Sequence, residues 1–473
     1  MAFNDALALL NLRLNDVARG QRYLSLAKQL RQLISEQRLA LDSRLPATRK
    51  LAEQLGVSRT SVLNAYEVLV AEGLVRARPG SGYYVAAVPT TASSAQRQSA
   101  ASHVQTSPAK HANPAFASSG DLEQFPFALW RRCLNRVWAK PDLTMLCEVP
   151  AGGYHPLKQA ICDYSLRLRG VQCRPEQVFV TAGSRDTLAL IYAALLERGN
   201  SVALENPCYP PLRQGLLAHG ANLHPCAVDA EGMQLASEPC RLAWMTPAKQ
   251  YPTSTLMSRE RRMAWLSYAR EHGTYLVEDD FDAEFIYRRS TPETLWQLSQ
   301  QMTDSSVLLA GSFSKVLFPS LRVGYLLVPE QLVERFTAAQ SRLGNLCSVP
   351  MQPVVAEFIA EPQFHSYLRR MRRLYQRRRD HLYQLIESQL AEYFQPVLPD
   401  GGMVMPVYAK KRLRLSDSAL QAQLKECGIH APALSKQFHG EGRQGLLLGY
   451  SAASEAQLSE AVAKLAELCR SAD

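Results

Sequence analysis

Short apolar runs alternate with amphipathic helical patterns through the middle of this chain, and that alternation constrains the fold more than any other feature. Runs rich in aliphatic and β-branched residues occupy positions 178–183, 201–206, 241–247, 274–280 and 306–312. Most are separated by patterns typical of helices, such as DTLALIYAALLERG. This rhythm predicts an α/β fold with a parallel or mostly parallel sheet and helices on both faces. Ligands of such sheets bind at the carboxyl ends of the strands.

Residues 87–114 divide the chain into two parts. The segment AVPTTASSAQRQSAASHVQTSPAKHANP contains no aromatic residue and almost no large aliphatic one. A segment of that composition cannot bury enough apolar surface to offset the entropy lost on ordering, so it is predicted to be a flexible linker. We therefore expect one domain in residues 1–86 and a second in residues 115–473.

Charge and cysteine usage narrow the class of protein. The net charge is +10, and residues 1–86 contain twelve Lys or Arg against seven Asp or Glu, a balance that suits a polyanionic partner. No stretch of eighteen apolar residues occurs, so the chain is not expected to span a membrane and is expected to be cytoplasmic. The ten cysteines form no C-x-x-C pair. The sequence therefore gives no sign of a disulfide framework or of a metal site.

The N-terminal domain has the pattern of a winged helix-turn-helix. A short amphipathic helix is expected over Thr48–Leu55, followed by a sharp turn at Gly56-Val57. Ser58 is a suitable N-cap for a second helix from Arg59 to about Glu72. Two strands joined by the basic loop RPGSG would form the wing. A helix ahead of these elements would supply the apolar stripe Leu26, Leu30, Leu33 and Ile34.

Several positions of this domain are suited to DNA contact. The first turn of the second helix can present side chains and backbone N–H groups to bases and phosphates, and glycines let the wing approach closely. The candidate contact residues are Arg49, Ser58, Arg59, Thr60 and Gly80. A small helical protein-interaction domain with a solvated basic face is the alternative that spacing alone leaves open.

The same stretch resembles a known family. The Leu45-Pro46 opening, LAEQLGVSRTSV, AYEVLVAEGLV and RPGSG are similar to the DNA-binding domain of the GntR family of bacterial repressors and activators. The resemblance covers residues 23–86 and implies that the candidate positions contact promoter DNA. One departure is Lys50, where members of the family commonly have Glu.

The second domain offers each group that pyridoxal 5′-phosphate (PLP) requires. That cofactor needs an amine for a Schiff base, a carboxylate at its pyridine nitrogen, anion-binding groups for its phosphate and a ring to stack on it. A helix N-terminus after a strand is a ready phosphate site. The candidates are Lys315 for the amine, Asp279 for the carboxylate, Gly183, Ser184, Ser312 and Arg322 for the phosphate, and Tyr209 for the ring.

Each of these residues has an ordinary explanation by itself. A lone lysine is more often a surface amine, an aspartate within EDDFD a solvated turn, and a tyrosine after a strand a packing residue. Their occurrence together, in order and at successive strand ends, favours a cofactor site over coincidence.

The second domain as a whole resembles fold-type I aminotransferases over residues 121–473. More closely, the chain is similar to the MocR subfamily, in which a GntR-type winged helix is linked to such a domain. FPFALWRRCLNRVW, GGYHPLKQAI, VTAGSRDTLALI, ENPCYPP, TPAKQYPTS, VEDDFDAEF and GSFSKVLFPSLRVGYL stand in the subfamily's order. The resemblance implies that Lys315 carries PLP as an internal aldimine. It also implies a homodimer, because cofactor sites of this fold lie at a dimer interface.

Several positions depart from the family pattern. Arg185 occupies a place usually given to Gln, where it would add charge at the phosphate or point away. Phe281 stands where related regulators commonly have a Tyr that hydrogen-bonds the ring oxygen of the cofactor. Tyr251 aligns near a position where the enzymes have an Asn with a similar role, so it would either compensate for the missing hydrogen bond or not. Arg443 is the candidate for binding an effector carboxylate, with an exposed loop residue as the equal alternative. Leu447 stands where many catalytic aminotransferases have Arg.

The combined resemblance implies a bacterial transcription regulator that binds promoter DNA through its winged helix. Its aminotransferase-like domain would bind PLP and sense an amine, an amino acid or the cofactor itself. An active aminotransferase with an autoregulatory DNA-binding domain is the alternative, and Leu447 counts slightly against it. A third possibility is a degenerate pocket that responds to a partner protein, against which the retention of Lys315 and Asp279 argues.

Overall fold

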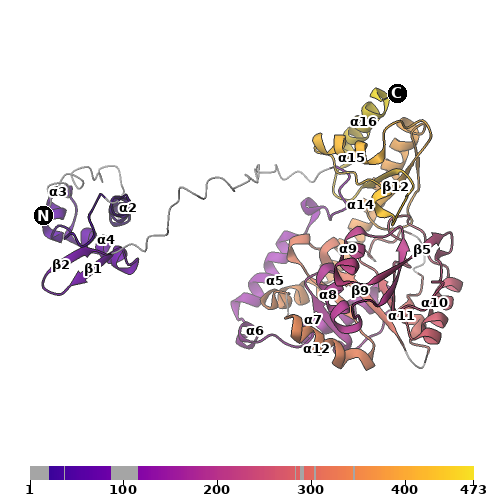
Figure 1. Cartoon of the computed structure of the whole chain (residues 1–473), viewed down its shortest axis with the longest axis horizontal. Coiled ribbons are helices and arrows are strands. Elements are labelled where there is room, and N and C mark those ends of the chain that lie inside the picture. The colour runs from indigo at the N-terminus through magenta and orange to yellow at the C-terminus, as the bar shows by residue number, and fades with distance from the viewer. Residues whose placement is uncertain are drawn as a thin grey trace. The chain divides into compact units, whose positions relative to one another are not determined.

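A computed structural model describes residues 21–36, 38–86, 115–282, 284–287, 292–302, 305–344 and 347–472. The linker predicted at residues 87–114 lies outside the described residues. By backbone contacts the chain divides into two compact units, Met1–Ala109 and Lys110–Asp473. Both are drawn in Figure 1.

The described part of the N-terminal unit contains three helices and a two-stranded hairpin (Figure 1). Its elements are α2 (Arg22–Ser35), α3 (Thr48–Leu55), α4 (Arg59–Ala71), β1 (Val75–Arg78) and β2 (Gly82–Val85). The predicted apolar stripe of α2 is buried in one core with Val62 and Tyr66 of α4. The two strands pair antiparallel, with Val75 opposite Val85. These elements confirm the predicted winged helix-turn-helix.

Local chemistry explains where these helices begin and end. α3 stops at Gly56, which has a φ of 63° and adopts the left-handed conformation that glycine tolerates. α4 begins after Ser58, whose Oγ accepts the backbone N–H of Ser61 at 3.1 Å. The Tyr66 hydroxyl donates to the backbone carbonyl of Pro46 at 3.0 Å, so α4 is tied to the segment that precedes α3.

The second unit is built on an eight-stranded sheet in the order β3-β10-β9-β8-β7-β4-β5-β6. Its strands are β3 (Val178–Thr181), β4 (Ser201–Asn206), β5 (Asn222–Asp229), β6 (Gly232–Met233), β7 (Leu242–Met245), β8 (Tyr275–Asp279), β9 (Val307–Ser312) and β10 (Gly324–Leu327). Neighbours from β9 through to β5 are parallel, whereas β10 runs antiparallel to both β3 and β9. The five strands expected from the sequence are all present, and the predicted mostly parallel sheet is confirmed.

Three strands of this sheet, β5, β6 and β10, lie outside the predicted set. β5 interrupts its apolar residues with His224 and Pro225, and much of it is only partly buried. β6 and β10 have only two and four residues. β5 and β6 therefore lack the apolar run that marks a buried parallel strand. β10 is fully buried and as long as β3 and β7, so its apolar sequence GYLL carries a strand signal that the prediction did not use.

Helices cover both faces of the large sheet. Alternate residues of β3 belong to different cores, Val178 and Val180 to one and Phe179 to the other. The first core is covered by α7 (His155–Arg169), α10 (Arg259–His272) and α13 (Gln352–Ala360), and the second by α8 (Ser184–Leu195), α9 (Pro210–His219) and α12 (Val333–Leu343). Because both faces are buried, the strands read as continuous apolar runs.

A smaller antiparallel sheet follows in the order β11-β12-β13. Its strands are β11 (Phe394–Pro396), β12 (Val404–Ala409) and β13 (Gly445–Gly449), and α14 (Pro362–Gln389), α15 (Asp417–Glu426) and α16 (Glu455–Ser471) pack around it (Figure 1). None of the helices in the described part of the chain is long and apolar enough to cross a membrane.

The parallel strands of the large sheet place polar residues along one edge. β4, β8 and β9 end at the polar residues Asn206, Asp279 and Ser312, and Thr246 follows the end of β7. Because parallel strands share one direction, the residues that follow these ends meet at the same edge of the sheet.

Removal of the α4 N-cap tests the local folding of the N-terminal unit. Ser58→Ala removes the side-chain acceptor of the Ser61 N–H and leaves only the backbone carbonyl of Ser58 at 3.0 Å, so we expect the free energy of unfolding of this unit to fall by about 1 kcal/mol. Hydrogen exchange of the α4 amides in the full-length chain measures the change. Thr60→Ala removes an exposed hydroxyl that makes no cap and is the matched control. An equal loss in both variants would contradict the capping role.

Candidate functional site

A cavity of about 340 Å³ lies at the carboxyl ends of β4, β7, β8 and β9. The predicted residues that line it are Ser184, Tyr209, Tyr251, Asp279, Ser312, Lys315 and Arg322. Residues far apart in the sequence thus meet in one place, as expected for groups that follow successive parallel strands.

Lys315 ends a short 3-10 turn that directly follows β9. Its Nζ donates to the backbone carbonyl of Ser118 at 2.6 Å. Burial lowers the pKa of this amine below the ordinary lysine value of 10.5; the negative charge of Asp282 opposes that shift and the positive charge of Lys249 adds to it. An amine with a lowered pKa is neutral, and therefore nucleophilic, at a lower pH than a surface lysine.

Asp279 is the last residue of β8 and also lies in the cavity. Its Oδ2 accepts the indole N–H of Trp244 at 3.1 Å. Burial raises the pKa of this carboxyl well above its ordinary value, and the Trp244 hydrogen bond opposes that shift. A cationic N–H donor beside Asp279 would offset the cost of burying its charge, and a protonated pyridine ring is such a donor.

The start of α8 lies at one corner of the same cavity, where Ser184 is a lining residue and the preceding Gly183 is not. Gly183 is the N-cap, with a φ of 85°, and a Cβ added there would lie 3.3 Å from the guanidinium of Arg322. Ser184 and Ser312 line the cavity, and the Oγ of Ser312 accepts the N–H of Ser314 at 3.1 Å. Helix N-terminal amides, hydroxyls and an arginine together are groups that bind phosphate.

Tyr209, Tyr251 and Phe281 supply the aromatic part of the lining. Tyr209 is 46% exposed, and its ring meets that of Tyr251 edge-to-face with centroids 5.7 Å apart. The Tyr251 hydroxyl donates to the side-chain carbonyl oxygen of Gln437 at 3.4 Å. Phe281 has no hydroxyl, and the phenols of this group are those of Tyr209 and Tyr251.

Two predicted site residues lie elsewhere. Arg185 is exposed and is not among the residues that line the cavity. Arg443 is exposed as well, its guanidinium lies 3.8 Å from the centroid of the Tyr408 ring in a cation–π contact, and it is not among the residues that line the cavity. The structure therefore places neither arginine where it would meet a ligand in the cavity. Leu447, on the strand that follows Arg443, is buried.

Sequence reasoning missed Glu205, which lines the cavity near the end of β4. Its carboxylate accepts the N–H of Thr246 at 3.0 Å, the hydroxyl of Thr246 at 2.5 Å and the side-chain amide of Gln250 at 3.2 Å. Burial raises the pKa of Glu205 to about 7, against the effect of these hydrogen bonds. Glu205 thereby holds the turn that carries Tyr251, through partners that no local pattern reveals.

The acidic stretch EDDFD is not a solvated turn. Asp279 is partly buried and accepts a hydrogen bond from Trp244, Asp280 pairs with Arg169 of α7, and Asp282 pairs with Lys249. Lys249, Asp280 and Asp282 also line the cavity. Their partners lie far away in the sequence, so the sequence could not assign them.

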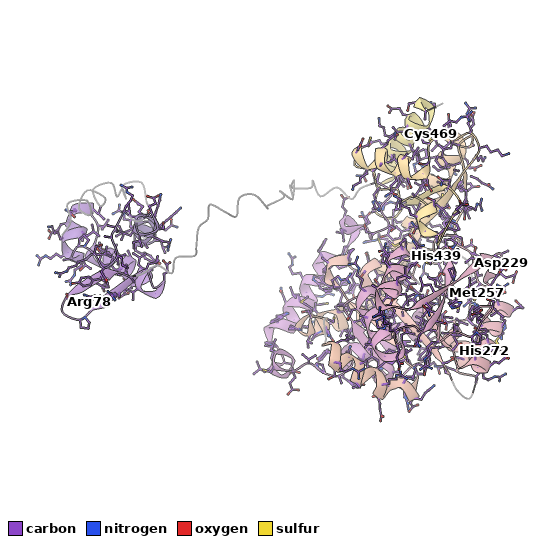
Figure 2. The ribbon with its side chains drawn as sticks, viewed as in Figure 1. Arg78, Asp229, Met257, His272, His439 and Cys469 are labelled. Atoms are coloured by element: carbon purple, nitrogen blue, oxygen red, sulfur yellow. The ribbon has the colours of Figure 1, made fainter. Side chains whose placement is uncertain are left out.

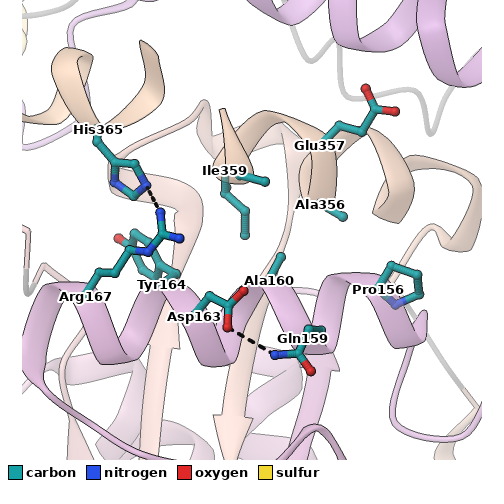
Figure 3. Close-up of a pocket in the computed structure, with 11 residues that line it drawn as sticks. Pro156, Gln159, Ala160, Asp163, Tyr164, Arg167, Ala356, Glu357, Ile359 and His365 are labelled. Carbon is teal, nitrogen blue, oxygen red and sulfur yellow. Dashed lines mark hydrogen bonds between the residues drawn. The ribbon is translucent and has the colours of Figure 1, made fainter. Parts of the chain in front are cut away.

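A second cavity, of about 330 Å³, lies between α7 and α13 (Figure 3). In it the side-chain amide of Gln159 donates to Asp163 at 3.1 Å, and Arg167 faces His365 at 3.4 Å. Its lining residues include no lysine and no helix N-terminus with free hydroxyls. It therefore lacks the groups that PLP requires.

The N-terminal unit presents the predicted DNA contacts at its surface. The residues Arg49, Ser58, Arg59, Thr60 and Gly80 are all exposed. The Nε of Arg59 donates to Thr48 at 3.3 Å, which links the first turn of α4 to the first turn of α3. Arg78 on the wing, labelled in Figure 2, lies 4.4 Å from the centroid of the Tyr84 ring. Positive charge thus lies on both the second helix and the wing.

Two parts of the chain match known families. Residues 22–85 match the bacterial regulatory proteins of the gntR family, and residues 146–465 match aminotransferase class I and II. An archaeal alanine:glyoxylate aminotransferase is 22% identical with a TM-score of 0.69, over 76% of this chain and 90% of that one. LysN, the α-aminoadipate aminotransferase of Thermus thermophilus, is 25% identical with a TM-score of 0.68, over 75% and 91%. These likenesses confirm the fold of the second unit.

Other relatives match along nearly the whole chain. The Rhizobium meliloti regulatory protein MocR, whose name assigns it to rhizopine catabolism, is 35% identical over 93% of this chain and 92% of that protein. PdxR of Corynebacterium glutamicum, named a pyridoxine biosynthesis transcriptional regulator, is 27% identical over 93% and 94%. The chain is thus a transcription regulator of the MocR subfamily, in which a GntR-type helix-turn-helix domain and an aminotransferase-like domain share one polypeptide.

Proposed function

We propose that this regulator binds promoter DNA through its winged helix and holds PLP on Lys315, where an amine, an amino acid or PLP itself is the signal. The observation that carries the proposal is that Lys315, Asp279 and Arg322 line one cavity of about 340 Å³. When bound, PLP supplies an aldehyde carbon that forms a Schiff base with an amine. The DNA partner implies a cytoplasmic protein.

The cavity residues fit this cofactor group by group. Lys315 is a partly buried amine whose pKa is lowered by burial, and the partly buried carboxyl of Asp279 suits a pyridinium nitrogen. Arg322 and the α8 N-terminus at Gly183 would bind the phosphate. Tyr209 would stack on the ring, since it lines the cavity with nearly half of its surface exposed.

The N-terminal surface fits duplex DNA. The exposed first turn of α4 carries Arg59 and Thr60 for the major groove, and Gly80 lets the wing approach the backbone. Arg49 on α3 is exposed and would contact phosphate. The match of residues 22–85 to the gntR family supports DNA contact by this domain, and the resemblance implies contact at these positions.

Signal transfer would depend on what Lys315 holds. An effector amine that bonded to the cofactor in place of Lys315 would free the Lys315 side chain and would occupy the same cavity. DNA affinity changes only as far as the ligand binds the two states of the protein differently.

A homodimer is part of the proposal. Exposed large apolar residues gather on α5 (Phe127–Ala139), α6 (Leu143–Cys147) and the segment after them. They are Phe127, Trp138, Leu143, Leu146 and Val149, of which Leu143 is 71% exposed. Apolar surface of this kind marks a protein interface.

An active aminotransferase is the second candidate, because the solved structures of similar fold are aminotransferases. Against it, no arginine from the C-terminal part of the described chain lines the cavity, and the position of Leu447 is filled by a buried apolar side chain. Turnover with an amino donor and a keto acid separates the two candidates. Sustained multiple turnover would favour the enzyme.

Borohydride reduction tests the identity of the cofactor lysine. Reduction of the PLP-loaded protein should fix the label on Lys315, and Lys315→Ala should show no label and no imine absorbance band. Peptide mass spectrometry locates the label. Lys249 lines the same cavity and is the internal control, and a label on Lys249 would contradict the assignment.

The phosphate corner is tested by crowding Arg322. Gly183→Ala places a Cβ 3.3 Å from the Arg322 guanidinium, so PLP should bind roughly tenfold more weakly if a charge-assisted hydrogen bond is lost. Gly440→Ala is the matched control, because Gly440 has the same φ of 85° but nothing within 4 Å. Equal PLP affinity of the two variants, measured by absorbance titration, would refute the placement of the phosphate.

The rate of PLP capture should follow the ionisation of Lys315. Only the neutral amine attacks the aldehyde carbon. Because burial lowers the pKa of Lys315 below 10.5, the capture rate should rise with pH with a midpoint below pH 10.5. Stopped-flow absorbance measures it, with free Nα-acetyl-lysine as the reference. A midpoint at or above the reference value would count against a buried amine.

DNA binding is tested at Arg59. If this side chain reads a base, Arg59→Ala should weaken binding to DNA selected by the protein by about 1–3 kcal/mol and relax specificity. If it touches phosphate alone, all sequences should weaken alike and the salt slope should shrink by about one. Arg31→Ala is the control, since Arg31 pairs with Glu72. Unchanged affinity of the Arg59 variant would argue against the predicted interface.

A further inference from the structure

We propose that Lys249, held in place by Asp282, binds the carboxylate of an amino-acid effector. The inference rests on the proposed function, because it assumes that the amino group of the effector reaches the cofactor at Lys315. Lys249 takes the place of Arg443 as the candidate that binds the effector carboxylate, because Lys249 lines the cavity and Arg443 does not.

In the part of the chain that the structure describes, Lys249 is the one cationic side chain of the cavity lining that the proposed cofactor does not use. Among the described residues, the cationic side chains that line the cavity are Lys249, Lys315 and Arg322. Lys315 would bond to the aldehyde carbon of the cofactor, and Arg322 lies against Gly183, where the phosphate would bind. A carboxylate that enters a buried site needs a cationic hydrogen-bond donor. Lys249 is the cation left for it.

The Lys249 ammonium has more N–H donors than its hydrogen bond to Asp282 uses. An ammonium group carries three N–H donors, and Asp282 accepts one of them. Among the described residues, Asp282 is the one that accepts a hydrogen bond from Lys249. The two side chains are 15% and 25% exposed, so a ligand in the cavity can reach the remaining donors.

The turn before β12 is shaped around this ion pair. Gly402 has a φ of 80°, and a Cβ added there would overlap Nζ of Lys249 and lie 2.9 Å from the carboxylate of Asp282. The carbonyl oxygen of Gly402 accepts the hydroxyls of Tyr287 and Tyr450 at 2.6 and 2.7 Å. The chain is thus held close to the pair without a side chain between them.

The acidic residues of the cavity do not close this site to an anion. Asp280 is paired with Arg169, and the carboxylate of Glu205 is hydrogen-bonded to Thr246 and Gln250. Asp279 would face the cofactor ring. Asp282 alone lies beside Lys249, and it also keeps the ammonium oriented. A ligand carboxylate would share the ammonium with Asp282, as two carboxylates commonly share one cation.

The carboxylate can be tested separately from the amine. Ethylamine is what remains of either alanine or β-alanine when the carboxylate is removed, so the three probes isolate the effect of that group. Each is titrated against the PLP-loaded full-length protein, and the change in the cofactor absorbance band gives the dissociation constant. In Lys249→Met, alanine or β-alanine should bind roughly ten- to a hundredfold more weakly, whereas ethylamine should be unaffected. Lys249→Arg should keep the preference for the amino acids.

The controls separate this inference from the proposed function. Lys436→Met changes a lysine outside the cavity lining and should leave all three titrations unchanged. Lys249→Gln serves the same comparison if the Met variant does not load PLP. Equal weakening of ethylamine and the amino acids, or no weakening of either, would overturn the carboxylate site but leave amine sensing intact. If no probe shifts the band of the natural protein, amine sensing fails, and the inference fails with it.

Discussion

Burial of charge at the carboxyl ends of the parallel strands is the constraint on which the second unit depends. A buried charge needs a partner or loses its ionised form. Asp280 meets this need through Arg169, and Glu205 through Thr246 and Gln250. These contacts fix α7 and the turn after β7 against the strand ends, so the same interactions that satisfy the buried groups also shape the walls of the cavity.

Lys315 and Asp279 stand apart from that pattern. Burial shifts the pKa of each toward its neutral form, and no counter-charge among the described residues is bonded to either. Groups left in this condition lower stability and are characteristic of functional sites. A cofactor with an electrophilic carbon at one end of a ring and a basic nitrogen at the other would give both residues a partner.

How far the sequence predicts the molecule depends on the range of the interactions. The winged helix follows from local rules, an N-cap at Ser58, a left-handed turn at Gly56 and an apolar stripe, so its elements were predicted almost residue by residue. The large sheet follows from its apolar runs. β5 was missed because Pro225 and partial exposure hide it.

The candidate site was predictable only in part. Residues directly after strand ends, such as Asp279 and Lys315, were found because topology brings strand ends together. Lys249 was not, because its partner Asp282 lies 33 residues away. Arg443 was misplaced because an exposed cation–π contact and a buried carboxylate site look alike in sequence.

The central claim is that occupancy of Lys315 controls DNA binding, and one comparison tests it directly. The affinity of the PLP-loaded protein for DNA that it selects from a random pool is measured with and without an amine that shifts the cofactor band, and then again for Lys315→Ala. The account predicts that the amine changes the affinity of the natural protein and not that of the variant. An equal change in both proteins, or no change in either, would contradict it.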